Sequence, residues 1–411
     1  MIPGTVHTLM LVATVAGSSP AAAAPAHRTQ QLMPADSTYG CVICHADKRR
    51  AFQQGVHAER GITCDACHGG DPSQVEVAPA HRGRFVGAPG KLETLRLCST
   101  CHADPDQMRQ FGLSADQLAE FRTSRHGQLL ITQGNMDAPT CTDCHDAHLI
   151  RPSTDARSNT HPTNIPATCG RCHDDAALMG KYGLPSDQLA RYREGAHGVA
   201  VFQDRNFAAP TCTGCHGSHA ALPPGIAQVT DVCGRCHLTL ERAFAAGPHG
   251  RAAAVSIERG CLGCHSNHGT ERVAPDAIAD LCASCHGAES QMVVLGGEIQ
   301  EQVQRAEEDL TLATEAIEEM AAEGHPVEDE RFRYVAAFTA FQQLAEVQHS
   351  LSLEELEDLG RQVRSNTSII RSTAEARAEE RWEHKLLLIP LWFLALSGIA
   401  FASFKLRELG R

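Results

Sequence analysis

The chain has 411 residues, of which only 5% are aromatic, while 18 are cysteine and 23 are histidine. A cytosolic enzyme keeps its thiols few and reduced, so this cysteine content excludes that class and points to bound cofactors. The net charge of −13 argues against a nucleic-acid partner, because a protein that neutralises phosphates needs a basic face.

The first 26 residues have the character of a secretory signal peptide. An apolar stretch runs from Thr8 to Ala16, and small residues end at Ala24-Pro25-Ala26, which predicts cleavage near His27. No lysine or arginine occurs before Arg28, so the signal is atypical or the start is slightly late. We expect residues 1–26 to be removed on export.

Every cysteine falls in a C-x-x-C-H frame, and there are nine such frames. This is the signature of c-type haem attachment: two thiols form thioethers with the haem vinyl groups, and the adjacent histidine becomes the proximal iron ligand. A lone C-x-x-C also fits a zinc half-site or a redox pair, but nine copies without a leftover thiol favour nine covalently attached haem c groups. The frames are Cys41-Cys44-His45, Cys64-Cys67-His68, Cys98-Cys101-His102, Cys141-Cys144-His145, Cys169-Cys172-His173, Cys212-Cys215-His216, Cys233-Cys236-His237, Cys261-Cys264-His265 and Cys282-Cys285-His286.

The spacing of these motifs predicts the fold of the haem domain, residues 27–290. Nine motifs between Cys41 and His286 leave too little chain to build a protein core around each haem. The haems themselves must form the core, held by covalent attachment and iron ligation. We therefore expect a mainly α protein with little regular structure in this domain, and closely spaced haems make electron transfer the default function.

An internal repeat organises the haem domain. Residues 111–127 recur as 182–198, and residues 135–148 recur as 206–219, both displaced by 71 positions, and a shorter third copy follows. The unit consists of an upstream His-Gly, a C-x-x-C-H-x-x-H block and then a plain C-x-x-C-H. Residues 57–102 form a degenerate first unit, with Asp71 near the place of its trailing histidine, and the motif at Cys41 stands alone in front.

Nine histidines lie between Cys41 and His286 outside the motifs, matching the nine irons. A second imidazole on each iron closes it to substrate and leaves only electron transfer, so we expect bis-histidine ligation throughout. The alternative is that some are ordinary surface histidines, above all His81 and His161, which lie outside the repeat. The nine are His57, His81, His126, His148, His161, His197, His219, His249 and His268.

The trailing histidines of the repeat are restricted by geometry. His148, His219 and His268 each follow a proximal histidine by three residues, which places them on the same side of their own porphyrin. They cannot reach its other face. We expect each to ligate a neighbouring haem and so to clip consecutive haems together.

The region after the haems, residues 291–385, is predicted to be an acidic helical hairpin. A heptad seam of alternating steps runs through 298–323, and Glu323-Gly324-His325-Pro326 breaks it. A second helix should begin near Glu328, with a break around Ser350 to Ser352. Residues 298–385 carry 21 acidic and 9 basic side chains, which we assign to solvated helix faces. The seam residues are Ile299, Val303, Ala306, Leu310, Ala313, Ile317 and Met320.

His349 in this region has two interpretations. Its spacing places it on one helix face with Val335, Phe338 and Ala345, pointing inward among apolar neighbours. It is either a buried core histidine or a tenth axial ligand. Together with His27, it is a substitute candidate should His81 or His161 be exposed to solvent.

A single membrane span is expected at residues 386–404. The stretch has 19 residues without a charge, close to the roughly 20 that cross a bilayer as a helix; a buried core helix is the alternative. Trp382 precedes it as an interfacial aromatic, and the basic tail 405–411, with Lys405, Arg407 and Arg411, belongs in the cytoplasm. The haem domain would then lie on the periplasmic side of the cytoplasmic membrane.

Paired HG…CxxCHxxH…CxxCH blocks, a helical hairpin and a terminal span resemble the membrane-anchored multihaem c-type cytochromes of bacterial respiratory chains, over residues 41–404. The resemblance implies a redox subunit that takes electrons from a quinol-oxidising membrane protein, with a b-type cytochrome or an iron–sulfur subunit, and passes them to periplasmic carriers or terminal reductases. One span has no room for its own pair of transmembrane haems, so quinol oxidation by this chain alone is not expected.

Two other functions compete with this one. A multihaem reductase or oxidase of small nitrogen or sulfur compounds would need a five-coordinate haem, but the C-x-x-C-K attachment of one such family is absent and spare histidines are ample. A subunit of an extracellular cytochrome filament is disfavoured by the C-terminal anchor. Electron transfer remains the leading hypothesis, with no catalytic residue expected.

Overall fold

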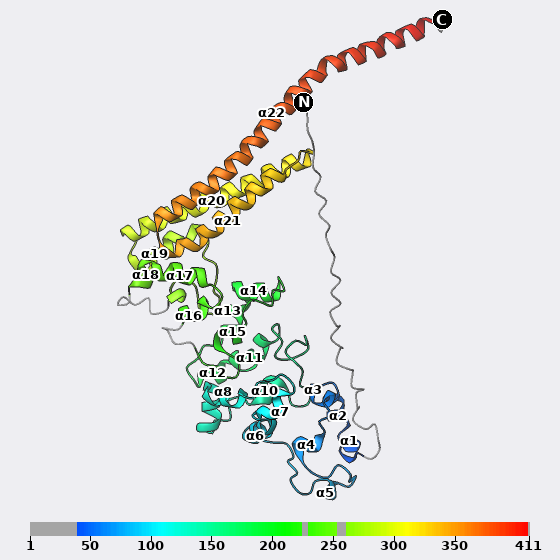
Figure 1. The fold of residues 1–411 in the computed structure, drawn as a ribbon, viewed down its shortest axis with the longest axis vertical. Helices are drawn as coiled ribbons and strands as arrows, with labels where there is room; N and C mark the ends of the chain where they lie inside the picture. Colours follow the sequence, from blue (N-terminus) through cyan, green and yellow to red (C-terminus); the bar gives the residue numbers. More distant parts are fainter. Residues whose placement is uncertain (1–38, 224–228, 253–259, 410–411) are drawn as a thin grey trace, which may run out of the picture. The chain divides into compact units, whose positions relative to one another are not determined.

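The computed structural model describes residues 39–223, 229–252 and 260–409, so the expected signal peptide and His27 lie outside it. Within these ranges the regular structure is helical, with no strand (Figure 1), which confirms the mainly α prediction. The described residues divide into two compact units. One is formed by residues 39–101 with Thr140–Ser158, and the other by His102–Pro139 with the described residues from 159 to 409.

The haem domain consists of short helices joined by loops, as expected. The longest has 12 residues. They are α1 (Gly40–Cys44), α2 (Ala46–Phe52), α3 (Val56–Glu59), α4 (Cys64–His68), α5 (Val77–Ala80), α6 (Lys91–His102), α7 (Pro105–Arg109), α8 (Gln117–Thr123), α9 (Arg125–Gly127), η1 (Gln128–Thr132), α10 (Cys141–His145), α11 (Ile165–His173), α12 (Ala176–Gly180), α13 (Gln188–Glu194), α14 (Ala196–Phe202), α15 (Cys212–His216), α16 (Val229–Gly234), α17 (Leu238–Ala246), α18 (Pro248–Arg251), η3 (Gly260–Gly263), η4 (Pro275–Ala277) and α19 (Ile278–His286).

Three attachment motifs coincide with a whole helix. In α4, α10 and α15 the five residues of the motif form one short helix, which brings the two cysteines, three positions apart, onto one face. The chain then turns sharply through a residue with positive φ: Gly69 (67°), Asp146 (70°) and Gly217 (80°). The ψ angles of these residues, −152°, 167° and 168°, are extended and not helical. Each helix therefore ends there, and each motif lies on its own isolated turn.

The acidic region folds into long helices: α20 (Gln291–Ala322), α21 (Glu328–Val347), η5 (Gln348–Ser350) and α22 (Leu353–Leu409). The heptad seam is confirmed, because all seven of its residues are buried. α20 and α21 form the expected hairpin. At the expected break the chain reverses through η5 and Leu351, whose φ is 57°, and α22 packs against both helices.

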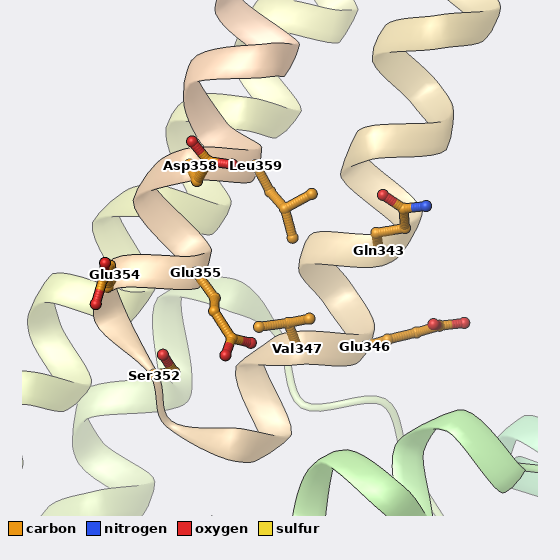
Figure 2. A pocket seen from close by; sticks show the side chains of 8 residues that line it. All are labelled: Gln343, Glu346, Val347, Ser352, Glu354, Glu355, Asp358 and Leu359. Atoms are coloured by element: carbon orange, nitrogen blue, oxygen red, sulfur yellow. The ribbon is translucent and has the colours of Figure 1, made fainter.

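The result is a three-helix bundle, called here the helical bundle and comprising α20, α21 and the part of α22 before the apolar end. Its main core joins residues from all three helices: Ile299, Val303, Ala306, Leu310, Ala337, Ala340, Leu344, Leu356 and Val363. A pocket at the reversal is lined by four carboxylates and no cysteine or histidine (Figure 2): Gln343, Glu346, Val347, Ser352, Glu354, Glu355, Asp358 and Leu359.

The helix face predicted for His349 was wrong. Val335 and Phe338 are 60% and 41% exposed, because α21 packs through its small residues Ala337 and Ala340 instead. α21 ends at Val347, so His349 lies in η5 and not on a helix face. It is half-buried there.

The C-terminal segment of α22, Leu388–Leu409, is long and apolar enough to cross a membrane. None of it is buried against the described protein, so it is not a core helix. Its start is close to the expected residue 386, and it continues through Lys405 and Arg407 of the expected tail. These features fit a single-pass membrane protein.

Candidate haem-binding sites

Three motif histidines are oriented by a backbone carbonyl. The Nδ1 of His68 lies 2.9 Å from Val86 O, that of His216 lies 3.2 Å from Leu222 O, and that of His265 lies 2.9 Å from Glu271 O. A donated Nδ1–H hydrogen bond fixes the tautomer in which Nε2 is free to bind a metal. The sequence carried no signal for these acceptors, because any residue has a carbonyl.

The imidazole rings come together in pairs, each consisting of one motif histidine and one histidine from outside the motifs. In seven such pairs the ring centroids lie 5.9 to 6.4 Å apart. They are His45–His81, His68–His148, His126–His173, His197–His237, His216–His268, His249–His286 and His265–His349.

This separation fits two imidazoles on opposite faces of one iron. A histidine nitrogen lies about 2.0 Å from a transition metal that it binds. The ring centre lies roughly a further 1.2 Å away, so two axial imidazoles have centroids about 6.4 Å apart. The observed pairs have this spacing, and together with two thiols per motif they suit haem c.

The pairs follow the repeat. The upstream histidines His126, His197 and His249 each lie beside the plain motif of their own repeat, at His173, His237 and His286. A close approach explains the glycine that follows them: a Cβ on Gly198 would lie 1.8 Å from Tyr192 O. The His-Gly pair thus combines a candidate ligand with the one residue that fits there.

Two trailing histidines lie beside motif histidines of the preceding repeat. His148 and His268 lie beside His68 and His216, away from their own motifs. The prediction that they clip consecutive haems together was wrong for these two, because each reaches the first motif of the preceding repeat. The plain motif in between is paired with the upstream histidine instead.

The two histidines outside the repeat frame differ. His81 lies 6.4 Å from His45 and stacks on Phe85 at 4.1 Å. His161 contacts the edge of Phe207, and its Nδ1 lies 2.7 Å from Thr163 Oγ1. Only His81 therefore has the position expected of an axial ligand.

The remaining two repeat histidines lie in the expected elements. His57 lies in the short helix α3, directly after Val56. His219 follows α15, and its Nδ1 lies 3.6 Å from a carboxylate oxygen of Glu120. Their chain positions correspond to those of the paired histidines.

Within each of the two compact units, consecutive motifs lie side by side, as contacts between their cysteine sulfurs show. Hydrogen bonds join the first cysteines of successive motifs and raise the pKa of one thiol in each pair: Cys98 with Cys141, Cys169 with Cys212, and Cys233 with Cys261. Burial and the charge of a neighbouring thiol raise the pKa of Cys67 beside Cys101, of Cys215 beside Cys236 and of Cys264 beside Cys282 and Cys285. These sulfurs stand for the thioether sulfurs of the mature protein.

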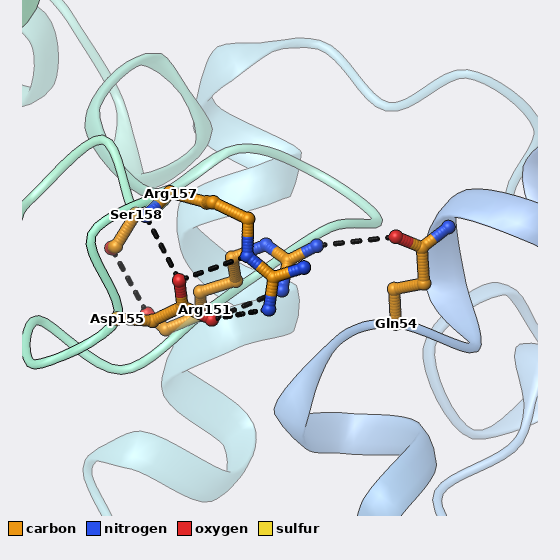
Figure 3. Close-up of polar contacts among 5 residues, drawn as sticks. All are labelled: Gln54, Arg151, Asp155, Arg157 and Ser158. Carbon is orange, nitrogen blue, oxygen red and sulfur yellow. Dashed lines mark hydrogen bonds and ion pairs between the residues drawn. The ribbon is translucent and has the colours of Figure 1, made fainter.

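A polar network holds the segment after His148 in place (Figure 3). The buried Arg151 forms an ion pair with Asp155 at 3.1 Å and donates to Gln54 Oε1 at 3.3 Å. Arg157 donates twice to Asp155, and Ser158 Oγ donates to Arg151 O. The network ties this loop to the residues that precede α3.

The sequence matches three family models: cytochrome c3 over residues 56–174, the doubled CXXCH motif over residues 254–291, and cytochrome c554 and c-prime over residues 12–69. No curated protein matches it. The matches, the motifs and the helical fold define a multihaem c-type cytochrome with covalently bound haem c.

Proposed function

We propose that this protein conducts electrons through nine haem c groups, each closed by two axial histidines. The observation that carries the proposal is the repeated pairing of a motif histidine with a second imidazole at 5.9 to 6.4 Å. An iron with two protein ligands has no position for substrate. The adjacency of consecutive motifs supports transfer from one haem to the next.

The pairing supplies distal ligands for the haems at Cys41, Cys64, Cys169, Cys212, Cys233, Cys261 and Cys282. The repeat leaves two motif histidines, His102 and His145, and two repeat histidines, His57 and His219. We assign the latter two to the remaining irons on the repeat register alone. His161 is then in excess and has no axial role.

The absorption and EPR spectra of the oxidised protein test this function. We expect nine haems by mass, low-spin signals only, and no binding of cyanide or nitrite at neutral pH. A stoichiometric high-spin signal that shifts on adding nitrite would reject the conduit and favour a reductase or oxidase of small nitrogen or sulfur compounds. A haem count below nine in fully matured protein would correct the stoichiometry.

We further propose that the protein is anchored in the cytoplasmic membrane with its haem domain in the periplasm, between a quinol-oxidising membrane protein and a periplasmic electron carrier. From Leu353 to the start of the apolar helix, α22 runs for 35 residues, or about 52 Å of helix. The acidic charge of the bundle opposes its lying flat on anionic lipid. The membrane partner therefore needs a redox group that extends well beyond the bilayer.

Removal of residues 386–411 tests the anchor and the donor. We expect a soluble protein with all its haems, since the deleted residues follow the last motif by about 100 positions. It should be reduced by dithionite as the full chain is, but only slowly by quinol-energised membranes. Equal rates with membranes would place the donor in solution, and loss of haem would give the helix a role in folding.

A further inference from the structure

The upstream-histidine segments dock in the same way in three repeats. The residue before the upstream histidine donates its N–H to a carbonyl one or two positions after a trailing histidine: Val56 to Ile150 at 2.9 Å, Arg125 to Ala221 at 3.1 Å, and Ala196 to Gly269 at 3.2 Å. Each repeat is therefore bound by the trailing-histidine segment of the next one. The last repeat, with His249, has no following repeat.

The helical bundle occupies the place of that missing segment. A Cβ on Gly247, two residues before His249, would lie 2.9 Å from Ser350 O and 3.1 Å from His349 O. In the same way, a Cβ on Gly55 would lie 3.0 Å from Ile150 O and 3.1 Å from His148 O. Pro248, which has no N–H to donate, stands where the three repeats have their donor.

His349 also has the ring geometry of a trailing histidine. Its centroid lies 6.3 Å from that of His265 with the planes at 21°, and the repeat pair His216–His268 has 6.1 Å and 21°. Its Nδ1 lies 3.1 Å from Glu346 O, and a donated Nδ1–H hydrogen bond leaves Nε2 as the nitrogen that can bind a metal.

We propose that His349 is the distal ligand of the haem at Cys261, so that the helical bundle caps the repeat array and completes one of its redox centres. This rests on the proposed bis-histidine function. Terminal repeats in repeat proteins need such caps, because they lack a neighbour on one side. At the other end, where Asp71 takes the place of a trailing histidine, His81 closes the haem at Cys41.

The test compares His349→Ala with His161→Ala in the full chain, purified in detergent with its haems attached. We expect His349→Ala to convert one haem from low-spin to high-spin, and added imidazole to restore the low-spin spectrum. His161→Ala should leave every haem low-spin. His325→Ala, at the opposite end of α21 from η5, controls for disturbance of the bundle and should also leave the spectrum unchanged.

A second variant tests the assignment if the His349→Ala protein fails to mature. His349→Met offers another axial ligand, and a methionine ligand raises the potential of a haem, so one haem should titrate at a higher potential while all stay low-spin. An unchanged spectrum in His349→Ala, or an unchanged titration in His349→Met, overturns the assignment, as does a high-spin haem in His161→Ala. High-spin haem in the wild-type protein would instead reject the proposed function.

Discussion

The haem domain and the helical bundle are both helical, but they are stabilised by different means. Among the described residues, 14 hydrophobic side chains are buried in the bundle and only nine in the haem domain, which is more than twice as long. Haem-domain helices have at most 12 residues, whereas α20 and α21 have 32 and 20 and α22, with its apolar end, has 57. Isolated helices shorter than about 12 to 15 residues are marginal in water, so the haem domain depends on its cofactors.

The strongest test of this difference is to produce the chain without haem attachment. We expect amides of residues 39–290 to exchange hydrogen rapidly, because metal ligation and haem packing provide the folding free energy there. Amides of α20 and α21 should stay protected, since their core is made of side chains. Hydrogen exchange measured by mass spectrometry would resolve the two regions.

The holoprotein is the control, with protection expected in both regions. Protection of residues 39–290 in the haem-free chain would show that this domain has a protein core after all. Loss of protection in α20 would instead show that the bundle folds only against the haem domain. Either result would remove the contrast between the two regions.

A smaller effect is expected from opening a cavity in the bundle. Leu344 is fully buried in the main core, and Leu344→Ala should cost about 2–5 kcal/mol of unfolding free energy. No iron ligand changes, so the visible spectrum should stay low-spin. Thermal unfolding followed by circular dichroism measures the first effect, and the haem absorption checks the second.

Phe338→Ala is the matched control on the same helix. Phe338 is 41% exposed, and surface substitutions usually change stability by about 0.5 kcal/mol or less. Equal destabilisation by the two variants would mean that another surface covers Phe338 in solution. A high-spin haem in Leu344→Ala would mean that η5 moves with the bundle core.

The parts of the fold that depend on local pattern were predictable. The spacing of Ile299 through Met320 determines which face of α20 is buried, and Gly324 with Pro326 marks its end, because these features act within a few residues along the chain. The face of α21 was not predictable from its large residues. Burial there is decided by how closely two other helices approach, which favoured Ala337 and Ala340 over Phe338.

The same limit applies to the histidines. The motif spacing identifies His265 as a haem residue, but nothing in the sequence near His349 distinguishes it from His161. The distinction depends on a backbone approach at Gly247 from a segment about 100 positions away. One local signal was available: a glycine stands two residues before His57, His197 and His249, where the backbone of another segment packs closely against it.

The smallest expected effect is a pH dependence of the loop held by Arg151. Hydrogen bonds from Arg157 and Arg151 hold the pKa of Asp155 well below its usual value near 4. A carboxyl with a lowered folded-state pKa contributes stability above its unfolded pKa, and loses it as the pH falls below about 4. Asp155→Asn should therefore speed amide exchange in residues 150–158 at pH 5 to 7. The difference from wild type should shrink towards pH 3.

Asp187→Asn, which removes a more exposed ion pair with Arg191 within one helical turn, should leave that loop unchanged. A difference that persists undiminished at pH 3 would show that shape, not the charge of Asp155, holds the loop beside α3.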